Sequence, residues 1–159
     1  MIQDEVSDVK SQLAKEHNVT INVEGKIMGP GSTIDEILVE ADRLRLTQVV
    51  SNLLTNAIKF TEHGTVSIRI ERRIDNNGIH HAVVSIKDNG QGIDPSIIPR
   101  LFEKFATKCD KSTGLGLGLF ISKNIIESHG GKIWAENNPE GKGATFTFSL
   151  PIARKHSVA

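Results

Sequence analysis

The sequence predicts an α+β fold, a two-layer sandwich in which a largely antiparallel mixed sheet is covered on one face by helices. Two pairs of alternating apolar segments predict strands joined by turns, and segments of helical periodicity connect them. Because no strand–helix–strand unit repeats, we expect most strands to pair antiparallel. The 159 residues, 38% hydrophobic and 24% charged, suit one globular domain.

The first 60 residues predict a helix, two strands and a second helix. Spaced apolar residues predict a short amphipathic helix through about residue 15, and alternation over 19–23 predicts a strand. A second short strand is expected over 34–39, after a turn-rich segment. Asp42 is a suitable N-cap for a longer helix that should run to about Phe60.

The rest of the chain predicts a hairpin, a helix and a final pair of strands. Asn77-Gly78 supplies the turn of the first hairpin, Gly130 ends the helix, and Pro139-Glu140-Gly141 separates the last two strands. The expected segments are 66–70 and 82–86 for the hairpin, 115–129 for the helix, and one strand from Ile133 and another over 144–150.

Charge and cysteine content exclude several classes of protein. The formal net charge is zero, so no overall basic field would attract nucleic acid. The single Cys109 excludes an internal disulfide framework and a cysteine-cluster zinc site, and fits a reducing compartment. No apolar run is long enough to cross a bilayer, and the first residues show no signal-peptide pattern.

The helix expected over 42–60 is the most informative segment, because it carries polar groups along one face. At about 100° per residue these groups fall within roughly 80° of one another. Asparagine is a poor helix former, so two of them one turn apart need an explanation. Their amide oxygens suit a metal ion and the following lysine suits an anion, which predicts a site for a metal-bound phosphate. A solvated polar face is the alternative. The stripe comprises Arg45, Gln48, Asn52, Asn56 and Lys59.

The segment Asp88-Asn89-Gly90-Gln91-Gly92-Ile93 predicts a second part of a site. Asp88 shares the strand parity of the apolar residues before it, so its carboxylate should face the buried side of the sheet. A buried carboxylate is costly without a donor, which the exocyclic amine of adenine could supply. Gly90 and Gly92 would let a flat ring approach, with Ile93 against it. The alternative is an aspartate that starts an Asp-Asn-Gly turn.

Three alternating glycines before the helix expected over 115–129 predict an anion site. Gly114, Gly116 and Gly118 leave backbone N–H groups uncovered at the positive end of the helix dipole. The spacing matches neither a Walker loop nor a dinucleotide fingerprint. Close helix packing is the alternative, but glycines at every second position do not share one helical face.

Together and in this order, the three motifs resemble the ATP-binding catalytic domain of sensor histidine kinases, in the GHKL ATPase superfamily. The resemblance extends from about Asp4 to Pro151 and implies a Bergerat-type ATP-binding fold. The F box and the His-Gly-Gly segment argue against the gyrase, chaperone and mismatch-repair branches. The matching segments are 42–61 (N box), 88–92 (G1 box), 101–105 (F box), 114–119 (G2 box), 121–133 and 141–146.

The resemblance implies ATP and Mg²⁺ as cofactors and a role for each matching residue. Asn56 would coordinate Mg²⁺, with Asn52 beside it and Lys59 on the phosphates, so these three are the candidate catalytic residues. Asp88 would accept from the adenine amine, and Thr145 would lie near the adenine, bonded to Asp88 directly or through water. The other implied ATP-binding residues are Gly90, Gly92 and Ile93 at the base, Phe105 and Lys108 at the lid over 106–113, and Gly114, Leu115, Gly116, Leu117, Gly118 and Leu119 at the phosphates.

One position departs from the family pattern. The family usually has a hydroxyl residue between the first two glycines of the G2 box, where this chain has Leu115. A leucine cannot hydrogen-bond to the lid or to a phosphate, so lid closure would be differently supported. The backbone amides survive the change, and we therefore still expect nucleotide binding.

The chain has no segment that resembles the family's phosphoacceptor site. Histidine kinases carry that histidine in a separate helical dimerisation domain, and none of the six histidines here has its context. His129 instead fits a helix-terminal residue favoured by the dipole. We expect 1–16 to be a linking helix from a missing dimerisation domain, 17–151 the ATP-binding domain, and 152–159 a tail, frayed from residue 154.

The expected function is transfer of the ATP γ-phosphoryl group to a histidine on that separate domain. A response regulator receiver domain would act downstream. We expect this fragment to be cytoplasmic and to make no contact with nucleic acid and no direct contact with a membrane. The alternative is a non-transferring nucleotide-binding module of the same fold, or an anti-sigma-type kinase. Asn56, Lys59 and Asp88 favour the enzyme, because a pure scaffold needs no metal-binding stripe.

Overall fold

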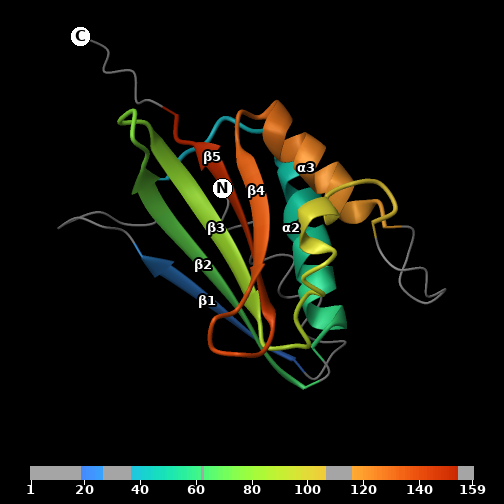
Figure 1. Ribbon diagram of the computed structural model, residues 1–159. Helices are drawn as coiled ribbons and strands as arrows, with labels where there is room; N and C mark the ends of the chain where they lie inside the picture. Colours follow the sequence, from blue (N-terminus) through green and yellow to red (C-terminus); the bar gives the residue numbers. More distant parts are fainter. Residues whose placement is uncertain (1–18, 27–36, 62, 107–115, 154–159) are drawn as a thin grey trace, which may run out of the picture.

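The computed structural model describes residues 19–26, 37–61, 63–106 and 116–153, which form a five-stranded sheet with two α-helices (Figure 1). Both helices lie over the same face of the sheet, so the predicted two-layer α+β sandwich is confirmed. The elements are β1 (Val19–Lys26), α2 (Arg43–Lys59), β2 (Gly64–Ile74), β3 (His80–Asp88), the short 3-10 helix η2 (Ile98–Arg100), α3 (Gly118–Ser128), β4 (Lys132–Asn137) and β5 (Ala144–Pro151).

The strand order is β1-β2-β3-β5-β4, and β1 is the strand that makes the sheet mixed. It runs parallel to β2, whereas β2–β3, β3–β5 and β4–β5 pair antiparallel. The expected hairpin joins β2 to β3, and Gly78 in its turn has φ +76°. Asp75 stabilises this turn, since its carboxylate accepts from the N–H groups of Asn77 and Ile79. These bonds, above all the one from Ile79, and His81 lower the pKa of Asp75.

The core lies between the apolar side of α2 and the sheet. Buried side chains alternate along the central strands, as at Ile68, Ile86 and Phe148, and form one cluster with α2. The buried residues of α2 lie opposite the predicted polar stripe, so the helical periodicity fixes which face of α2 remains available for a site. They are Leu46, Val49, Val50, Leu53, Leu54, Ala57 and Ile58.

The end of α3 is fixed by two glycines. Gly130 N–H donates to the carbonyl of Glu127 at 3.0 Å, and Gly131 N–H donates to the carbonyl of Ile126 at 2.9 Å. This is the Schellman arrangement, which needs a left-handed residue just past the helix, and Gly130 has φ +75°. The predicted helix stop is therefore confirmed.

His129 connects the end of α3 to the start of α2. Asp42, the predicted N-cap, accepts from Arg45 N–H through its side chain, and its own N–H donates to His129 Nε2 at 3.1 Å. His129 Nδ1 lies 2.7 Å from the carbonyl of Ile125, which only accepts, so the proton is on Nδ1. Through its two ring nitrogens, His129 connects the end of α3 to the start of α2.

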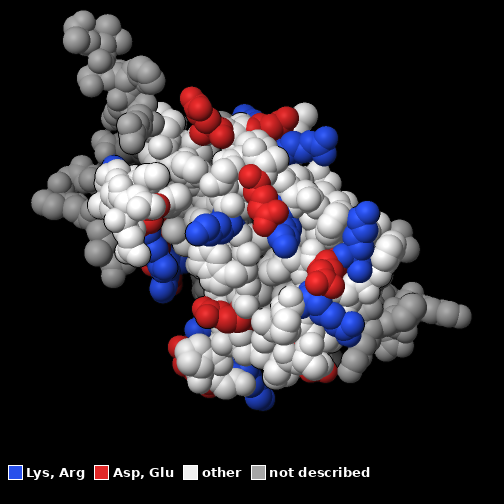
Figure 2. All heavy atoms as spheres, turned by 45° about the horizontal axis from the view of Figure 1, so that its top comes forward, with Lys and Arg blue, Asp and Glu red and all other residues white. Residues whose placement is uncertain are grey.

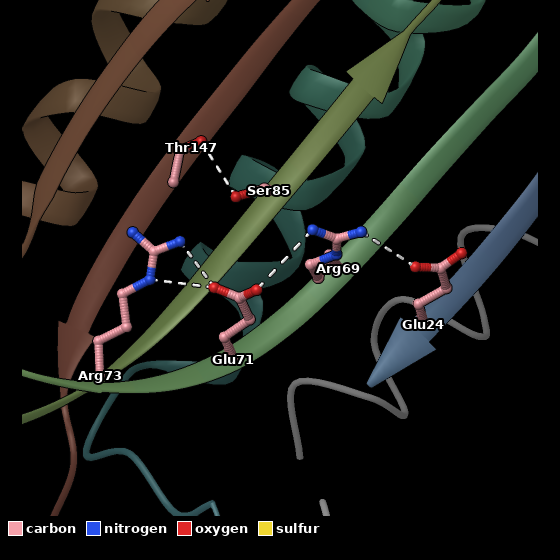
Figure 3. A network of polar contacts seen from close by, with 6 residues as sticks. All are labelled: Glu24, Arg69, Glu71, Arg73, Ser85 and Thr147. Carbon is pink, nitrogen blue, oxygen red and sulfur yellow. Dashed lines mark hydrogen bonds and ion pairs between the residues drawn. The ribbon is translucent and has the colours of Figure 1, made fainter. Parts of the chain in front are cut away.

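The face of the sheet away from the helices carries a charged network over β1 and β2, and buried polar side chains such as Thr147 and Ser149 over β5. Glu71 is bridged by Arg73 at 2.7 Å and by Arg69 at 3.9 Å, and Arg69 also reaches Glu24 at 3.3 Å (Figure 3). These ion pairs contribute little to stability, because Arg69, Arg73 and Glu24 are each more than half exposed. Figure 2 shows acidic and basic side chains interspersed over the visible face rather than gathered by sign. This pattern fits the zero net charge of the chain.

Two predicted boundaries change. Where a strand was expected over 34–39, the described residues 37–39 form only an isolated bridge between Val39 and Ile152. The expected tail also begins later than residue 152, because Ala153 N–H donates to the carbonyl of Leu38. Both changes have one cause: the described residues just before α2 pair with Ile152 and Ala153, which follow β5.

Other expectations lie partly or wholly outside the described residues. The predicted linking helix over 1–16 and the frayed tail from 154 are among them. The helix expected from residue 115 begins at Gly118, because Gly116 has φ +65°, which a right-handed helix cannot accommodate. No helix in the described ranges is long and apolar enough to span a membrane.

Candidate functional site

The polar face of α2 lies beside the start of α3. Asn52 and Asn56 are half-buried on this face, and Lys59 is exposed at the end of the helix. Asn52 Nδ2 donates to the carbonyl of Gly118 and to Oγ of Ser122, each at 3.3 Å. The stripe is therefore not simply a solvated face, since its first asparagine joins the two helices.

Asn56 is suited to a metal that arrives with phosphate. Its side chain has no hydrogen-bond partner among the described residues, and it lies one turn beyond Asn52. The described part of the chain has no cluster of three or more His, Cys, Asp or Glu side chains that could hold a metal ion by itself. Mg²⁺ keeps several waters and takes few protein ligands when a nucleotide supplies phosphate oxygens. A lone amide oxygen fits that chemistry.

Asp88 lies at the end of β3 with its carboxyl buried on the core side, as its parity predicted. The residue is 4% exposed, and Oδ1 accepts from Gly90 N–H at 2.9 Å and Ala144 N–H at 3.3 Å. Burial raises the pKa of Asp88, while these two N–H groups oppose the shift. Asp88 does start a turn, but no donor from the described residues meets Oδ2. The turn and the binding interpretation are therefore compatible.

The two glycines after Asp88 are required by the protein's own packing. A side chain on Gly90 would collide with the carbonyl of Phe60 at the end of α2. Gly92 has φ +79°, and a Cβ there would come within 2.9 Å of Asn137 Oδ1. Gly90 therefore fixes the distance between the Asp88 loop and α2, and Gly92 lets the loop turn.

Asn137 and Asn138, which were not among the predicted site residues, hold the Asp88 loop. Asn137 Oδ1 accepts from Ile93 N–H at 2.7 Å, and its Nδ2 donates to the carbonyl of Ile93 at 2.8 Å. Asn138 is buried, and its Nδ2 donates to the carbonyls of Asp88 and Lys142 at 2.7 and 2.8 Å. The turn between β4 and β5 thus clamps the loop at both ends. The Asn137-Asn138-Pro139 turn signal was the available clue.

Thr145 makes no direct bond to Asp88, which was one of the two forms in which this contact was expected. Thr145 Oγ1 donates instead to Asn138 Oδ1 at 2.6 Å. Successive residues of a strand face opposite sides, and Thr145 pairs with Lys87, so its side chain lies on the other face of the sheet from the Asp88 carboxyl. The residue that meets the carboxyl is Ala144, through its backbone N–H.

The start of α3 presents backbone donors. Its N-cap, Leu117, makes no side-chain capping bond, and the described part of the chain offers no acceptor to the N–H groups of the first turn. Gly116, just before it, turns the chain with φ +65°. Leu119 is half-buried against the core and so contributes packing here. Gly114 and Leu115 lie outside the described residues.

The segment that precedes the predicted lid is attached to α3. Lys104 Nζ lies 5.0 Å from the centroid of the Phe120 ring, a cation–π distance. Phe105 is 66% exposed and has φ +57°, an uncommon conformation for a bulky residue. Its predicted contact with the ligand stays a prediction. Lys108 and most of the predicted lid lie outside the described residues.

These features are arranged along one helix. The carbonyl of Phe60, at the end of α2, lies against Gly90 of the Asp88 loop, and Asn52 lies against Gly118 of α3. Eight residues separate the two points, so they are about 12 Å apart along the axis at 1.5 Å per residue. A ligand that fits both ends has a hydrogen-bond donor at one end and an anion at the other.

A family model described as "Histidine kinase-, DNA gyrase B-, and HSP90-like ATPase" matches residues 41–154. The chain belongs to this ATPase family. The match includes α2, the Asp88 loop and α3, and it supports ATP as the substrate of this domain. The sequence-based assignment to this family is confirmed.

Within this ATPase family the chain is similar to sensor histidine kinases. It is 41% identical over 142 residues to the sensor protein FixL of Bradyrhizobium diazoefficiens, which covers 88% of this chain and 26% of FixL. The catalytic domain of histidine kinase ThkA superposes with a TM-score of 0.75 at 33% identity, covering 94% and 91% of the two chains. Full-length ShkA in complex with AMPPNP gives a TM-score of 0.69 at 31% identity, covering 96% of this chain and 29% of ShkA. The chain spans about a quarter or less of the length of the curated relatives it matches first.

Proposed function

We propose that this ATPase-family chain is the catalytic domain of a sensor histidine kinase, transferring the γ-phosphoryl group of ATP to a histidine on a separate dimerisation domain. The observation that carries the proposal is the arrangement along α2 of a buried carboxylate at one end and an uncapped helix start at the other. This arrangement suits adenine and a phosphate chain. The similarity to sensor kinases favours the kinase over a purely regulatory module.

At the adenine end of the site, Asp88 recognises the nucleotide base. Its Oδ2 accepts from the exocyclic amine of adenine, while Oδ1 remains bonded to Gly90 and Ala144. Ile93, held by Asn137, lies against the ring. A guanine carbonyl at the same place would face the carboxylate as a second acceptor, which selects against GTP.

At the phosphates, the chain positions and neutralises charge. Asn56 would hold Mg²⁺, Asn52 would lie beside it on the same face, and the long side chain of Lys59 would extend from this face toward the phosphates. The free N–H groups of the first turn of α3 donate to phosphate oxygens. Mg²⁺, when bound with ATP, neutralises charge on the phosphate oxygens. Catalysis in this class of reaction is mainly positioning and electrostatic stabilisation.

The phosphoryl acceptor belongs to another domain. A neutral imidazole nitrogen attacks the γ-phosphorus, the new P–N bond forms as the bond to the bridging oxygen breaks, and ADP leaves. We propose that the dimerisation domain of the parent kinase supplies this imidazole and that a response regulator receives the phosphoryl group. Both partners imply a cytoplasmic location for this domain.

Phosphotransfer in trans tests the proposal. ATP labelled at the γ-phosphate is added to this chain together with a candidate dimerisation domain. The expected product is acid-labile, base-stable label on that domain, formed only with Mg²⁺ and reduced in the Asp88→Asn variant at limiting ATP. The control is the chain alone, which should stay unlabelled. If the folded chain gives no calorimetric heat with Mg-ATP, the proposal is overturned.

A further inference from the structure

Ser122 is a polar residue in a position that otherwise belongs to the core. It is 0% exposed, and the other buried residues of α3 are Ile125 and Ile126. A buried hydroxyl is costly unless it is hydrogen-bonded. The partner of Ser122 is Asn52, whose Nδ2 donates to its Oγ at 3.3 Å. The hydroxyl therefore connects α3 to the polar face of α2.

The orientation of the Asn52 amide follows from its second partner. The carbonyl of Gly118, 3.3 Å away, can only accept, so the amide nitrogen and not the oxygen must face α3. A Cβ built on Gly118 would lie 3.7 to 3.9 Å from the three amide atoms, which is ordinary contact, so the amide is seated on the first residue of the helix. The other arm, Oδ1, has no donor among the described residues.

Two acceptors on α3 thus fix which arm of the amide faces the site. The last torsion of an asparagine side chain is broad, so one hydrogen bond leaves the amide plane free to rotate about it. The second bond, to Ser122, removes that freedom. It leaves Oδ1 as an acceptor on the same face as Asn56, one turn away.

We propose that Ser122 is a positioning residue for the magnesium–nucleotide complex, holding Asn52 so that its Oδ1 accepts from the waters of the metal. The inference rests on the proposed function. It assigns Ser122 an effect on the metal and phosphate end of the site and none on adenine recognition, which depends on Asp88.

The test compares ADP binding with and without Mg²⁺, by calorimetry on the whole chain. In Ser122→Ala, the enhancement of affinity by Mg²⁺ should fall about three- to tenfold, the range for one neutral hydrogen bond. Affinity for metal-free ADP should not change. Ser122→Thr keeps the hydroxyl and should keep the enhancement. Ser128→Ala is the matched control. Ser128 Oγ donates to the carbonyl of Ile125 within α3 and lies 3.3 Å from Nδ1 of the adjacent His129.

A spectroscopic readout separates positioning from general loosening. The side-chain amide signals of Asn52, in ¹H–¹⁵N spectra of the nucleotide-free chain, should shift in Ser122→Ala and stay in place in Ser128→Ala. If Ser122→Ala does not fold, Ser122→Cys, which is closer in volume and a weak acceptor, takes its place in both measurements.

Two results would overturn the inference. One is an unchanged Mg²⁺ enhancement in the variant that lacks the hydroxyl. The other is an equal loss of affinity with and without metal, which would mean that Ser122 only supports the fold. A wild-type chain that binds no nucleotide would overturn the proposed function as well, whereas wild-type binding with an indifferent Ser122→Ala would overturn this inference alone.

Discussion

Replacing Asp88 by asparagine should separate nucleotide recognition from stability, because the two depend on the carboxyl in opposite ways. Asparagine is nearly the same shape, and its Oδ1 can still accept from Gly90 N–H and Ala144 N–H, at 2.9 and 3.3 Å in the present structure. Its Nδ2 then takes the place of Oδ2. The adenine amine would face a donor instead of an acceptor.

The magnitude follows from the kind of bond that is lost. A hydrogen bond to a charged acceptor contributes about 1.5–3 kcal/mol. The dissociation constant for Mg-ATP should therefore rise roughly 10- to 150-fold. The preference for ATP over GTP should fall as well, because the selective acceptor is gone. Competition between the two nucleotides, measured by calorimetry, gives both numbers.

The same variant should lose nucleotide affinity without losing stability. Burial raises the pKa of Asp88 above its unfolded value, so between these two pKa values the native state holds a proton that the unfolded chain has lost. The free energy of unfolding therefore falls as pH rises through this window, and the ionised carboxylate remains a cost at neutral pH. Asp88→Asn removes that cost. Urea unfolding without nucleotide, at pH 7, should show a variant at least as stable as wild type.

Asp88 does not recognise adenine if the Asp88→Asn variant binds ATP like wild type, or if the variant discriminates against GTP to the same extent. A variant markedly less stable at neutral pH would contradict the expected stability, since that would make the carboxylate a stabilising part of the fold. Wild-type protein measured at the same pH values is the control, and its own loss of stability with rising pH should be reduced in the variant.

Three other outcomes are expected. Asn56→Ala should abolish the Mg²⁺ dependence of ADP binding and any phosphotransfer, yet leave metal-free ADP affinity unchanged by calorimetry; normal phosphotransfer would contradict the role of the stripe. Asn137→Ala removes the 2.7 and 2.8 Å bonds to Ile93, each worth about 0.5–1.5 kcal/mol, and calorimetry should show ATP binding weakened by up to both bonds together, roughly 5- to 150-fold. Phe148→Ala should lower the free energy of unfolding by about 3–5 kcal/mol in urea, because Phe148 is fully buried; a loss below 1 kcal/mol would mean the core had been misassigned.

The elements could be predicted where one physical rule determined them. The core side of α2 follows from helical periodicity, the buried carboxyl of Asp88 from strand parity, and the end of α3 from the glycine at 130. Each rule acts within a few residues, so the sequence is sufficient. The parallel pairing of β1 with β2 is different, because both patterns read alike in either direction.

The site was harder to predict where it depends on contacts between residues that are far apart in sequence. Thr145 was expected near the adenine and Asp88 because of the resemblance to the kinase family, yet strand alternation places its side chain on the far face. Which residue of β5 meets the carboxyl, Ala144 through its N–H, depends on the register between β3 and β5, and that register is a tertiary fact.

The hydrogen bonds that orient the site residues also join segments that are far apart in sequence. Asn137 lies 44 residues from Ile93, and Ser122 lies 70 residues from Asn52. In the sequence, one is part of a turn and the other a small residue in an apolar helix, and neither pattern indicates a binding site. Their importance comes from the partner, which only the fold supplies. Residues that touch the nucleotide can therefore be selected from sequence motifs, whereas the residues that orient them require the structure.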